Sequence, residues 1–381
     1  MKKTISFLIS ILMFCGSMNM VRGDEVKLYA RSAVLMDAES GEVLYGKSEK
    51  TVMPNASTTK IMTCLYVLEH CSLDEQAVVS KKAASQPKVR LGVQTGEKYK
   101  VRDLLYGLML ESYNDCAVVL AEHAAGSVES FSQKINEEAK KLGAKSTHFV
   151  SPNGLDASDS KGSHATTAYD LAVIMRKCIQ NPKFLEITRK KSYSFHDASG
   201  KRSFSCNNHN ALLSTMQGAV SGKTGFTSKA GYCYVGAVKQ NNITMIAVVL
   251  ASGWPPNKSY KWADVKQLVS YGTANYGLRD IIPDVSKLKD LPVEGGLKPK
   301  VSLKSKDLKI SKVMKKTDKV EIRCKIPSKI YAPVHKGEKL GEIHYMVNGK
   351  CITKRPVTAG ETISKKDYWW YLGKAMEQFS L

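Results

Sequence analysis

Residues 53–63, which read MPNASTTKIMT, decide both the fold and the chemistry expected of this chain. Apolar residues recur at helical spacing from Ser57 to His70, so a helix is predicted to start at the serine. Side chains three residues apart share one face of a helix, with Cβ atoms about 5–6 Å apart, so the amine of Lys60 can reach the Ser57 hydroxyl. Serine is a poor nucleophile without an adjacent base, and burial among apolar neighbours can lower the pKa of a lysine enough for that task.

The same Ser-x-x-Lys spacing recurs at three other serines, which are Ser85, Ser158 and Ser286. Those three lie in charged or loop-like stretches, and no long apolar helix follows them. One match by itself is better explained as a helix cap or a surface charge, and only its context distinguishes Ser57.

Two further strings downstream carry chemistry. Residues 112–114 read SYN, in which the hydroxyl can relay a proton and the amide can hold a peptide; residues 205–207, SCN, repeat this pattern. Residues 223–225 read KTG, which occurs once, just before a strand predicted over residues 231–238. The lysine supplies positive charge, the threonine a hydroxyl for a carboxylate, and the glycine a close approach to the backbone.

Helical and strand-like segments surround these strings. Helices placed between an early and a late β-hairpin predict an α+β fold with an antiparallel sheet flanked by helices, and we assign residues 24–278 to this domain. The predicted helices are residues 57–70, 102–126, 128–142, 167–179 and 262–276, and the predicted strands are residues 33–37, 42–45, 231–238 and 243–251.

The sequence changes character after Tyr276. Short β-type runs alternate with charged turns, which predicts a second, small all-β domain over residues 279–362. Residues 363–381 are predicted to form an amphipathic, membrane-associating tail, the alternative being a helix packed on its own domain. The apolar face of this tail comprises Tyr368, Leu372, Ala375, Met376 and Phe379, beside Trp369, Trp370, Lys365 and Lys366.

Residues 1–23 have the composition of a signal peptide. Two lysines precede an apolar run over residues 5–13, and residues 21–23, VRG, place small residues at the −3 and −1 positions of a cleavage site. An uncleaved membrane anchor is the alternative, but the apolar run is short for a span. Lipid attachment through Cys15 is less favoured, because a bulky residue precedes it. We therefore expect an extracytoplasmic protein.

The net charge limits the partners. The formal charge of +22 falls to +19 without residues 1–23, and residues 285–381 hold 22 lysines and arginines against 10 acidic residues. Such a balance suits nucleic acid, anionic lipid or an anionic cell wall equally well. Export argues against nucleic acid and leaves the membrane and the wall.

The cysteine pattern indicates no metal site. Of nine cysteines, eight remain beyond Cys15, and they include no Cys-x-x-Cys pair and no metal-binding spacing. Cys64 and Cys71 would lie two helical turns apart, too far for a disulfide between them. Small buried hydrophobic residues are the favoured interpretation, and disulfides formed after export stay open.

The three strings together resemble a known family. Ser-x-x-Lys, Ser-x-Asn and Lys-Thr-Gly in this order are the signature of penicillin-binding proteins and serine β-lactamases. Residues 53–63, 153–155 with His164, 208–210 and 222–227 are similar to D-alanyl-D-alanine carboxypeptidases, the low-molecular-mass penicillin-binding proteins. The β-rich domain and the tail resemble the C-terminal module and membrane anchor of that family.

The resemblance implies catalytic roles for four residues. Ser57 would attack the carbonyl between the two terminal D-alanines of a peptidoglycan stem peptide, and Lys60 would accept its proton. Ser112 with Lys223 would deliver a proton to the departing D-alanine. Water would then hydrolyse the acyl-enzyme, whereas a β-lactam would acylate the same serine and leave slowly. The resemblance implies that this reaction needs no metal and no cofactor.

The resemblance also implies substrate-binding residues, with Lys223 among them. Asn114 would orient the acyl side, and Thr224 would hold the terminal carboxylate. Gly225 would permit close approach, and the backbone N–H groups of Phe226 and the nucleophile would form the oxyanion hole.

Four positions depart from the family pattern or stay open. Tyr113 is bulky and is expected to narrow the cleft. Lys258 is our candidate for the basic residue that some relatives place beyond the Lys-Thr-Gly strand. His164 and His209 are interpreted as hydrogen-bonded structural histidines.

Several rival functions share these motifs. A β-lactamase is disfavoured by the extra β domain and the tail, whereas a transpeptidase or an endopeptidase of the same wall differs only in what attacks or what is cut. A non-catalytic penicillin-binding scaffold is disfavoured by the intact motif residues. The expected partners are stem peptides ending in D-Ala-D-Ala, β-lactam antibiotics, and the outer face of the cytoplasmic membrane through the tail.

Overall fold

Five antiparallel strands form the central sheet of the N-terminal part, in the order β2-β1-β11-β10-β9. The computed structural model describes residues 26–379, so the predicted signal peptide, residues 1–23, and Cys15 lie outside the described residues. Two predicted hairpins form, and β1 pairs with β11 to join them. The strands are β1 Ser32–Asp37, β2 Val43–Lys47, β9 Ala219–Thr227, β10 Gly231–Gln240 and β11 Ile243–Leu250.

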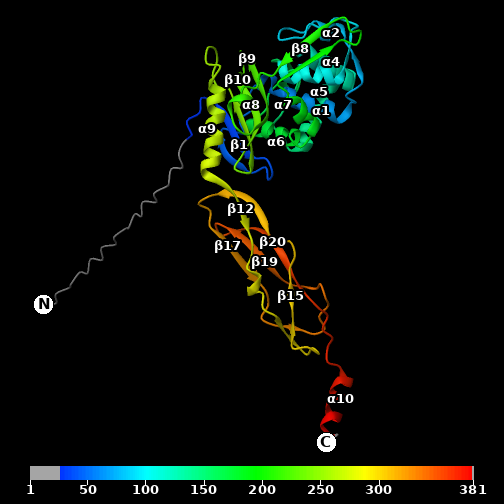
Figure 1. Ribbon diagram of the computed structural model, residues 1–381, viewed down its shortest axis with the longest axis vertical. Helices are drawn as coiled ribbons and strands as arrows, with labels where there is room; N and C mark the ends of the chain where they lie inside the picture. The colour runs from blue at the N-terminus through cyan, green and yellow to red at the C-terminus, as the bar shows by residue number, and fades with distance from the viewer. Residues whose placement is uncertain (1–25, 380–381) are drawn as a thin grey trace, which may run out of the picture.

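The sheet separates two apolar cores. In β1, Leu35 joins one core and Val34 and Met36 join the other, because successive side chains of a strand point to opposite faces. Helix α9, Tyr260–Asn275, covers the first face together with the short helix α8, Leu212–Thr215, whose Leu212 joins the same core, and the other helices of this part pack on the second (Figure 1). This arrangement confirms the predicted α+β fold.

The remaining elements of the N-terminal part are helices and small hairpins, of which α2, α7, α8 and the hairpins are not among the predicted elements. The helices are α1 Lys60–His70, α2 Lys81–Ala84, α3 Val101–Tyr106, α4 Asn114–Ala125, α5 Val128–Leu142, α6 Ala168–Cys178, α7 Pro182–Arg189 and α8 Leu212–Thr215. The hairpins pair β3 Gln76–Val78 with β4 Lys98–Lys100, β5 Ser158–Asp159 with β6 Gly162–Ser163, and β7 Ser192–His196 with β8 Ser203–Asn207.

The prediction of one helix over residues 102–126 is wrong. Helix α3 passes into a π-helical turn, Gly107–Glu111, after which Ser112 adopts a φ of +68° and α4 begins at Asn114. A left-handed residue costs about 1–2 kcal/mol, and contacts from elsewhere in the chain hold it here. The N–H of Asn114 donates to the carbonyl oxygen of Val89 at 2.8 Å. The apolar residues keep their helical spacing across this break, so the sequence pattern predicts one continuous helix.

Two further expectations near the motifs need correction. The predicted helix does not start at Ser57, because residues 56–59 form a 3₁₀ turn and α1 begins at Lys60. Residues 223–225 precede β10 as expected, but they lie within a further strand that was not predicted, β9, the edge strand of the sheet. The turn that carries Ser57 therefore lies against β9, the edge strand that carries residues 223–225.

The C-terminal part begins at Tyr276 and consists of strands. Its largest sheet has the order β15-β20-β19-β17, and its cores include Ile343, Tyr345 and Val357. The strands are β12 Tyr276–Ile281, β13 Leu291–Glu294, β14 Lys300–Val301, β15 Leu303–Lys304, β16 Ile310–Lys315, β17 Val320–Lys325, β18 Ile330–Tyr331, β19 Lys339–Val347 and β20 Lys350–Ala359. The all-β character expected of this region is confirmed.

The two parts lie end to end and make the molecule elongated (Figure 1). The Tyr276 hydroxyl donates to the carbonyl oxygen of Leu44 at 2.7 Å, and Lys312 forms an ion pair with Glu42 at 2.6 Å. These contacts join β12 and β16 to the hairpin of β1 and β2. The β-rich part is therefore attached to the N-terminal part at this hairpin of the central sheet.

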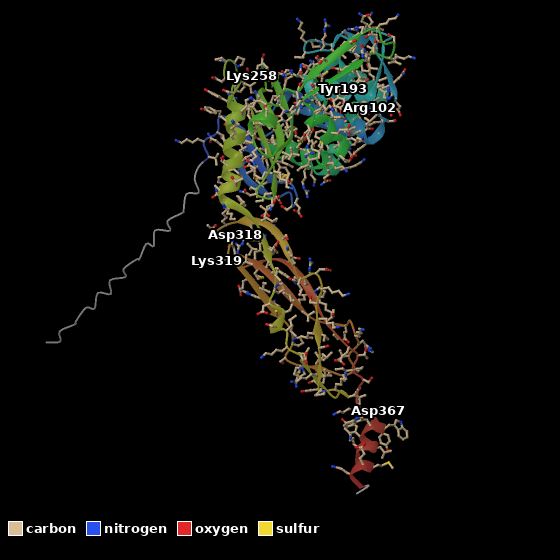
Figure 2. The ribbon with its side chains drawn as sticks, viewed as in Figure 1. Arg102, Tyr193, Lys258, Asp318, Lys319 and Asp367 are labelled. Carbon is tan, nitrogen blue, oxygen red and sulfur yellow. The ribbon has the colours of Figure 1, made fainter. Side chains whose placement is uncertain are left out.

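Helix α10, Tyr368–Phe379, lies at the end of the molecule farthest from the central sheet. Figure 2 shows Asp318 and Lys319 at the end of the β-rich part that faces the sheet, and Asp367 at the opposite end. The Asp367 carboxylate accepts the N–H of Trp370 at 2.9 Å and caps the helix. Across the described residues, no helix combines the length and the apolar character needed to cross a bilayer.

The cysteines of the described residues are free thiols. Five of them are buried, which fits their interpretation as small hydrophobic residues: Cys64, Cys116, Cys178, Cys206 and Cys233.

Candidate active site

Lys60 is buried and lies against the candidate nucleophile at the N-terminus of α1. Its Nζ donates to Ser57 Oγ at 2.8 Å, to Asn114 Oδ1 at 2.9 Å and to the carbonyl oxygen of Asn153 at 2.7 Å. A charged ammonium group can donate to all three acceptors; the neutral amine keeps two donors, for Asn114 and Asn153, and its lone pair then faces the Ser57 hydroxyl. The Ser57 hydroxyl also lies 3.2 Å from the Asn153 carbonyl oxygen.

The environment of Lys60 favours the neutral amine. Burial lowers the pKa of Lys60 well below its ordinary value, and the charge of Lys223 lowers it further, with weaker opposing effects from Cys116 and Asp115. A neutral amine that touches a hydroxyl can accept its proton. The pair is thus able to generate an alkoxide-like nucleophile at neutral pH.

Two glycines pack against the turn that carries Ser57. A Cβ on Gly154, whose φ is +83°, would lie 2.0 Å from the carbonyl oxygen of Ala56. A Cβ on Gly225 would lie 3.1 Å from the backbone nitrogen of Ser57. Ala56 itself has a φ of +49°, so this turn is strained and is held by its surroundings.

A second lysine and serine form a matching pair on the other side of the site. Lys223, from β9, donates from Nζ to Ser112 Oγ at 3.0 Å and to the carbonyl oxygen of Thr224 at 2.9 Å. Burial lowers the pKa of Lys223 to about 7. The break between α3 and α4 is what turns the Ser112 side chain toward β9, since a continuous helix would not bring this residue into a left-handed conformation.

A cleft of about 390 Å³ opens over these groups. Among the residues singled out from the sequence, Ser57, Ser112, Asn114, Thr224, Gly225 and Phe226 line it. Lys60 and Lys223 lie behind the two serines and reach the cleft through them. The structure therefore brings all eight predicted site residues together.

Lys261 also lines the cleft and was missed in the sequence. This side chain is 2% exposed and donates to the carbonyl oxygen of Lys258 at 2.7 Å, and its charge lies 4.7 Å from the ring centres of Tyr232 and Trp262. Burial lowers its pKa to about 8. Lys258 lines the cleft too, near the start of α9 (Figure 2). The signal in the sequence that could have identified Lys261 was its place directly before an aromatic residue, Trp262, in a helix.

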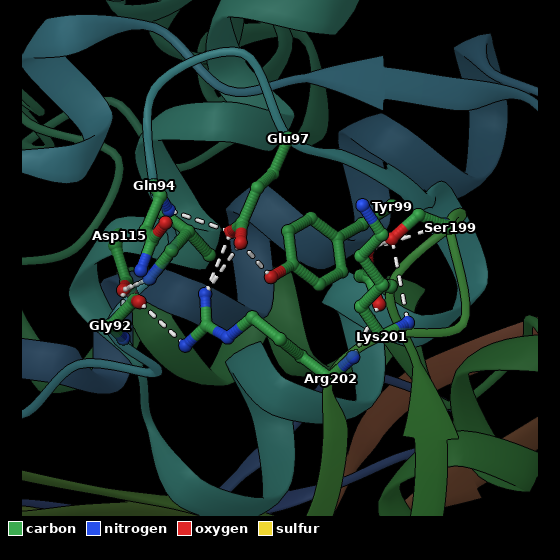
Figure 3. A network of polar contacts seen from close by, with 10 residues as sticks. Gly92, Gln94, Glu97, Tyr99, Asp115, Ser199, Lys201 and Arg202 are labelled. Carbon is green, nitrogen blue, oxygen red and sulfur yellow. Dashed lines mark hydrogen bonds and ion pairs between the residues drawn. The ribbon is translucent and has the colours of Figure 1, made fainter.

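A polar network supports the loop that forms one wall of the cleft (Figure 3). The Asp115 carboxylate accepts the N–H groups of three successive loop residues, 91–93, at 2.7–3.3 Å. Arg202 donates through one nitrogen to both Glu97 carboxylate oxygens at 2.7 and 2.8 Å, and through another to the Gly92 carbonyl oxygen at 3.0 Å. Because Asp115 follows Asn114 in α4, the loop and the site residue are held by the same helix.

The remaining candidates lie outside the reacting centre. His164 is buried; its Nδ1 accepts the N–H of Val150 at 3.0 Å, and its Nε2 lies 2.8 Å from Thr59 Oγ1, so it supports the nucleophile turn. His209 lies at the cleft rim, 2.7 Å from Glu111. The expectation that Tyr113 narrows the cleft is wrong, because its side chain packs against the apolar core.

Comparison with known proteins places this arrangement in context. A sequence model described as D-alanyl-D-alanine carboxypeptidase matches residues 19–253, and one described as the C-terminal domain of penicillin-binding protein 5 matches residues 276–365. The D-alanyl-D-alanine carboxypeptidase DacF of Bacillus subtilis is 29% identical over 363 residues, which cover 93% of this chain and 91% of the relative.

Solved structures agree with these matches. The D-alanyl-D-alanine carboxypeptidase DacD of Francisella tularensis superimposes with a TM-score of 0.69 at 25% identity, over 91% of this chain and 96% of that one. A mutant of a Streptomyces DD-transpeptidase superimposes with a TM-score of 0.60 at 31% identity, over 65% of this chain and 99% of that one. The first spans both parts of the molecule, and the second spans the part with the cleft.

Proposed function

The chain belongs to the D-alanyl-D-alanine carboxypeptidase family, the low-molecular-mass penicillin-binding proteins, and we propose that its reaction passes through an acyl-enzyme on Ser57. It is a serine peptidase that removes the terminal D-alanine of peptidoglycan stem peptides and binds β-lactams. The observation that carries the assignment of the nucleophile is the buried Lys60 amine, 2.8 Å from the Ser57 hydroxyl.

Acylation begins when the neutral Lys60 amine takes the proton of the Ser57 hydroxyl. The oxygen attacks the carbonyl carbon between the two D-alanines, and the negative charge that develops on the carbonyl oxygen is held by the N–H groups of Ser57 and Phe226. The closeness of Gly225 to the Ser57 nitrogen supports this oxyanion hole, because any side chain there would push β9 away from the nucleophile turn.

Departure of D-alanine requires a proton on its amine. Ser112 donates that proton and recovers one from Lys223, whose Nζ lies 3.0 Å away and whose pKa of about 7 suits transfer in either direction near neutrality. Lys60 then loses the proton that it took from Ser57, and Lys223 regains one, by exchange with the water of the cleft. Water attacks the acyl-enzyme with the restored Lys60 amine as the base, and the proton returns to the Ser57 oxygen as the ester breaks and the shortened peptide leaves. A β-lactam forms the same ester but retains its leaving group, so hydrolysis is slow.

Substrate binding uses the residues along the cleft. Thr224 and the positive charges of Lys258 and Lys261 bind the terminal carboxylate, and Asn114 orients the peptide on the acyl side. The apolar faces of Tyr232 and Trp262 hold Lys261 in place while leaving its charge directed toward an anion. The Lys261 ammonium donates to a backbone carbonyl oxygen, that of Lys258, and not to a carboxylate.

Transpeptidation is the second candidate, favoured by the fit to the DD-transpeptidase structure. Both reactions share the acyl-enzyme and differ only in whether water or an amine attacks it. Incubation of a diacyl-D-Ala-D-Ala peptide with and without an acceptor amine separates them, because a transpeptidase forms an amide product in addition to free D-alanine.

Residues 1–23 act as a signal peptide in this proposal, and α10 associates with the outer face of the cytoplasmic membrane. Large side chains of α10 are exposed: Tyr368, Trp369, Tyr371, Leu372 and Met376. The side chain of Phe379 lies outside the described part of the chain. Aromatic residues beside lysines are typical of helices that lie in the membrane interface. The helix is at the far end from the cleft, which would hold the cleft away from the bilayer.

A flotation assay tests the tail. The chain without residues 367–381 should stay with the soluble fraction when mixed with anionic phospholipid vesicles, whereas the full mature chain should float. Equal flotation of the two proteins would overturn the role of α10, and equal acylation by penicillin would show that both are folded.

The nucleophile is tested by the intact mass of the protein after incubation with benzylpenicillin. The wild type and Ser158→Ala should gain one covalent adduct, and Ser57→Ala should gain none. Ser158 is the matched control because it is an exposed serine with the same Ser-x-x-Lys spacing. An adduct on Ser57→Ala would overturn the assignment, and rapid drug hydrolysis without an adduct would indicate a β-lactamase.

A further inference from the structure

A second group of reactive side chains lies at the opposite ends of the two helices that carry Lys60 and Asn114. Cys71 directly follows α1, Glu75 precedes β3, and His123 lies in the last turn of α4. One ligand atom from each of these three side chains lies within 4.8 Å of the others. Over residues 26–379, this is the one such group of three histidine, cysteine or acidic residues.

The three side chains are held by different parts of the chain. Glu75 Oε2 lies 2.8 Å from His123 Nε2, and Glu75 Oε1 accepts the N–H of Ser72 at 3.2 Å. Cys71 is half-buried, and its backbone N–H continues the hydrogen bonding of α1 to the carbonyl oxygen of Val67 at 2.9 Å. The Glu75 carboxylate is thus held between the His123 ring and the backbone N–H of Ser72, the residue next to Cys71.

We propose that Cys71, Glu75 and His123 bind a Zn²⁺ ion. A thiolate, an imidazole and a carboxylate are the donors that Zn²⁺ takes in proteins, and a water molecule on the exposed side of Glu75 supplies the fourth position of a tetrahedron. Metal–ligand bonds of about 2.0–2.3 Å require donors roughly 3–4 Å apart, which the observed separations reach with small side-chain rotations.

The charges of this site balance. Zn²⁺ displaces the proton of the Cys71 thiol and leaves a thiolate and a carboxylate, two negative charges, against the two positive charges of the ion. Without a cation, burial and the neighbouring Glu75 raise the pKa of the Cys71 thiol, so the thiol stays protonated. The ion also replaces the hydrogen bond between Glu75 and His123, and one proton is released per ion bound.

The role that follows is stabilisation of the helix pair. The ion links the C-terminal ends of α1 and α4, and the Lys60–Asn114 hydrogen bond of 2.9 Å links their N-terminal ends. A ligand that binds only the folded state raises its stability in proportion to the logarithm of the free ligand concentration above the dissociation constant. The chemistry at Ser57 takes no part in this effect.

Spectroscopy with Co²⁺ as the probe tests the site. Co²⁺ added to the reduced, untagged mature chain should produce a thiolate-to-metal charge-transfer band and the visible bands of tetrahedral Co²⁺, at one ion per chain, and Zn²⁺ should abolish them. Cys71→Ser and His123→Gln should lack the charge-transfer band, and Cys351→Ser should keep it. Cys351 is a matched control because it is also a half-buried free thiol.

The absence of a charge-transfer band in the wild type, or its persistence in Cys71→Ser, would overturn the proposal. Thermal unfolding gives a second measurement: Zn²⁺ should raise the midpoint of the wild type and of Cys351→Ser but not that of His123→Gln. Acylation by benzylpenicillin at the wild-type rate shows that a variant without the band is folded. That control also separates a failure of the metal site from a failure of the proposed catalytic site.

Discussion

Replacement of Gly154 by alanine tests whether the position of the nucleophile turn limits acylation. A Cβ at this residue would lie 2.0 Å from the Ala56 carbonyl oxygen and 2.9 Å from the Ser57 nitrogen, whereas Cβ contacts shorter than 3.0 Å are essentially never seen. The turn must therefore move by about 1 Å, and a displacement of that size costs on the order of 10²-fold in rate. Acylation by benzylpenicillin should slow by about that factor.

Gly126→Ala provides the control for backbone strain. Gly126 has a φ of +80°, close to the +83° of Gly154, but a Cβ there would meet no atom within 4 Å. Both variants should lose about 1–2 kcal/mol of stability from the left-handed alanine; Gly154→Ala should lose more because of the steric clash, and it alone should also lose acylation rate. Stopped-flow acylation with a fluorescent penicillin measures the rates, and urea unfolding measures the stabilities. Equal acylation rates for the two variants would refute the reasoning.

Three further predictions concern the proton-carrying groups. Ser112→Ala should lower the turnover of diacyl-D-Ala-D-Ala by roughly 10²–10⁴-fold, as expected for the loss of a general acid. Ser205→Ala, at the exposed serine of residues 205–207, should leave turnover unchanged. Equal turnover of the two variants would refute the role of Ser112 as a proton relay. Burial sets the pKa of Lys223 at about 7, below its unfolded value of 10.5, so the unfolded chain binds the extra proton between these values and stability should rise with pH. The slope reaches about 1.4 kcal/mol per pH unit in urea unfolding, and Lys223→Met should flatten it. His164, whose pKa burial lowers from 6.5 to about 4, should cause a loss of stability as the pH falls from 6.5 to 4, and a His164→Gln variant with an unchanged slope would contradict this.

Most of the fold could be predicted because its elements have strong local signals. Alternation of apolar residues in β10 and β11 identifies two strands, and two successive residues with positive φ, Asn241 and Asn242, form the turn that residues of this type favour. The helix α5 ends at Gly143, which adopts the left-handed conformation that glycine permits. These features depend on neighbouring residues only, so the sequence pattern contains them.

The break at Ser112 could not be predicted in this way. The left-handed residue and the start of α4 depend on Val89, which meets Asn114 through a backbone hydrogen bond, and on Asp115, which holds the loop of residues 91–93. Without those contacts, the helical spacing of apolar residues over residues 102–126 favours one uninterrupted helix. A continuous helix would not direct Ser112 toward Lys223, so tertiary contacts decide this half of the site.

The sequence by itself determined which residues we propose for the chemistry: the serine and lysine three apart at residues 57 and 60, and the strings at 112–114 and 223–225. Their spacing and chemical type are local properties. Only the tertiary structure decided that the carbonyl oxygen of Asn153 orients Lys60, that Lys261 lines the cleft, and that Cys71, Glu75 and His123 meet at the far ends of two helices. These contacts join segments about 50 to 200 residues apart or use backbone atoms that every residue has, so no pattern of side chains along the chain records them.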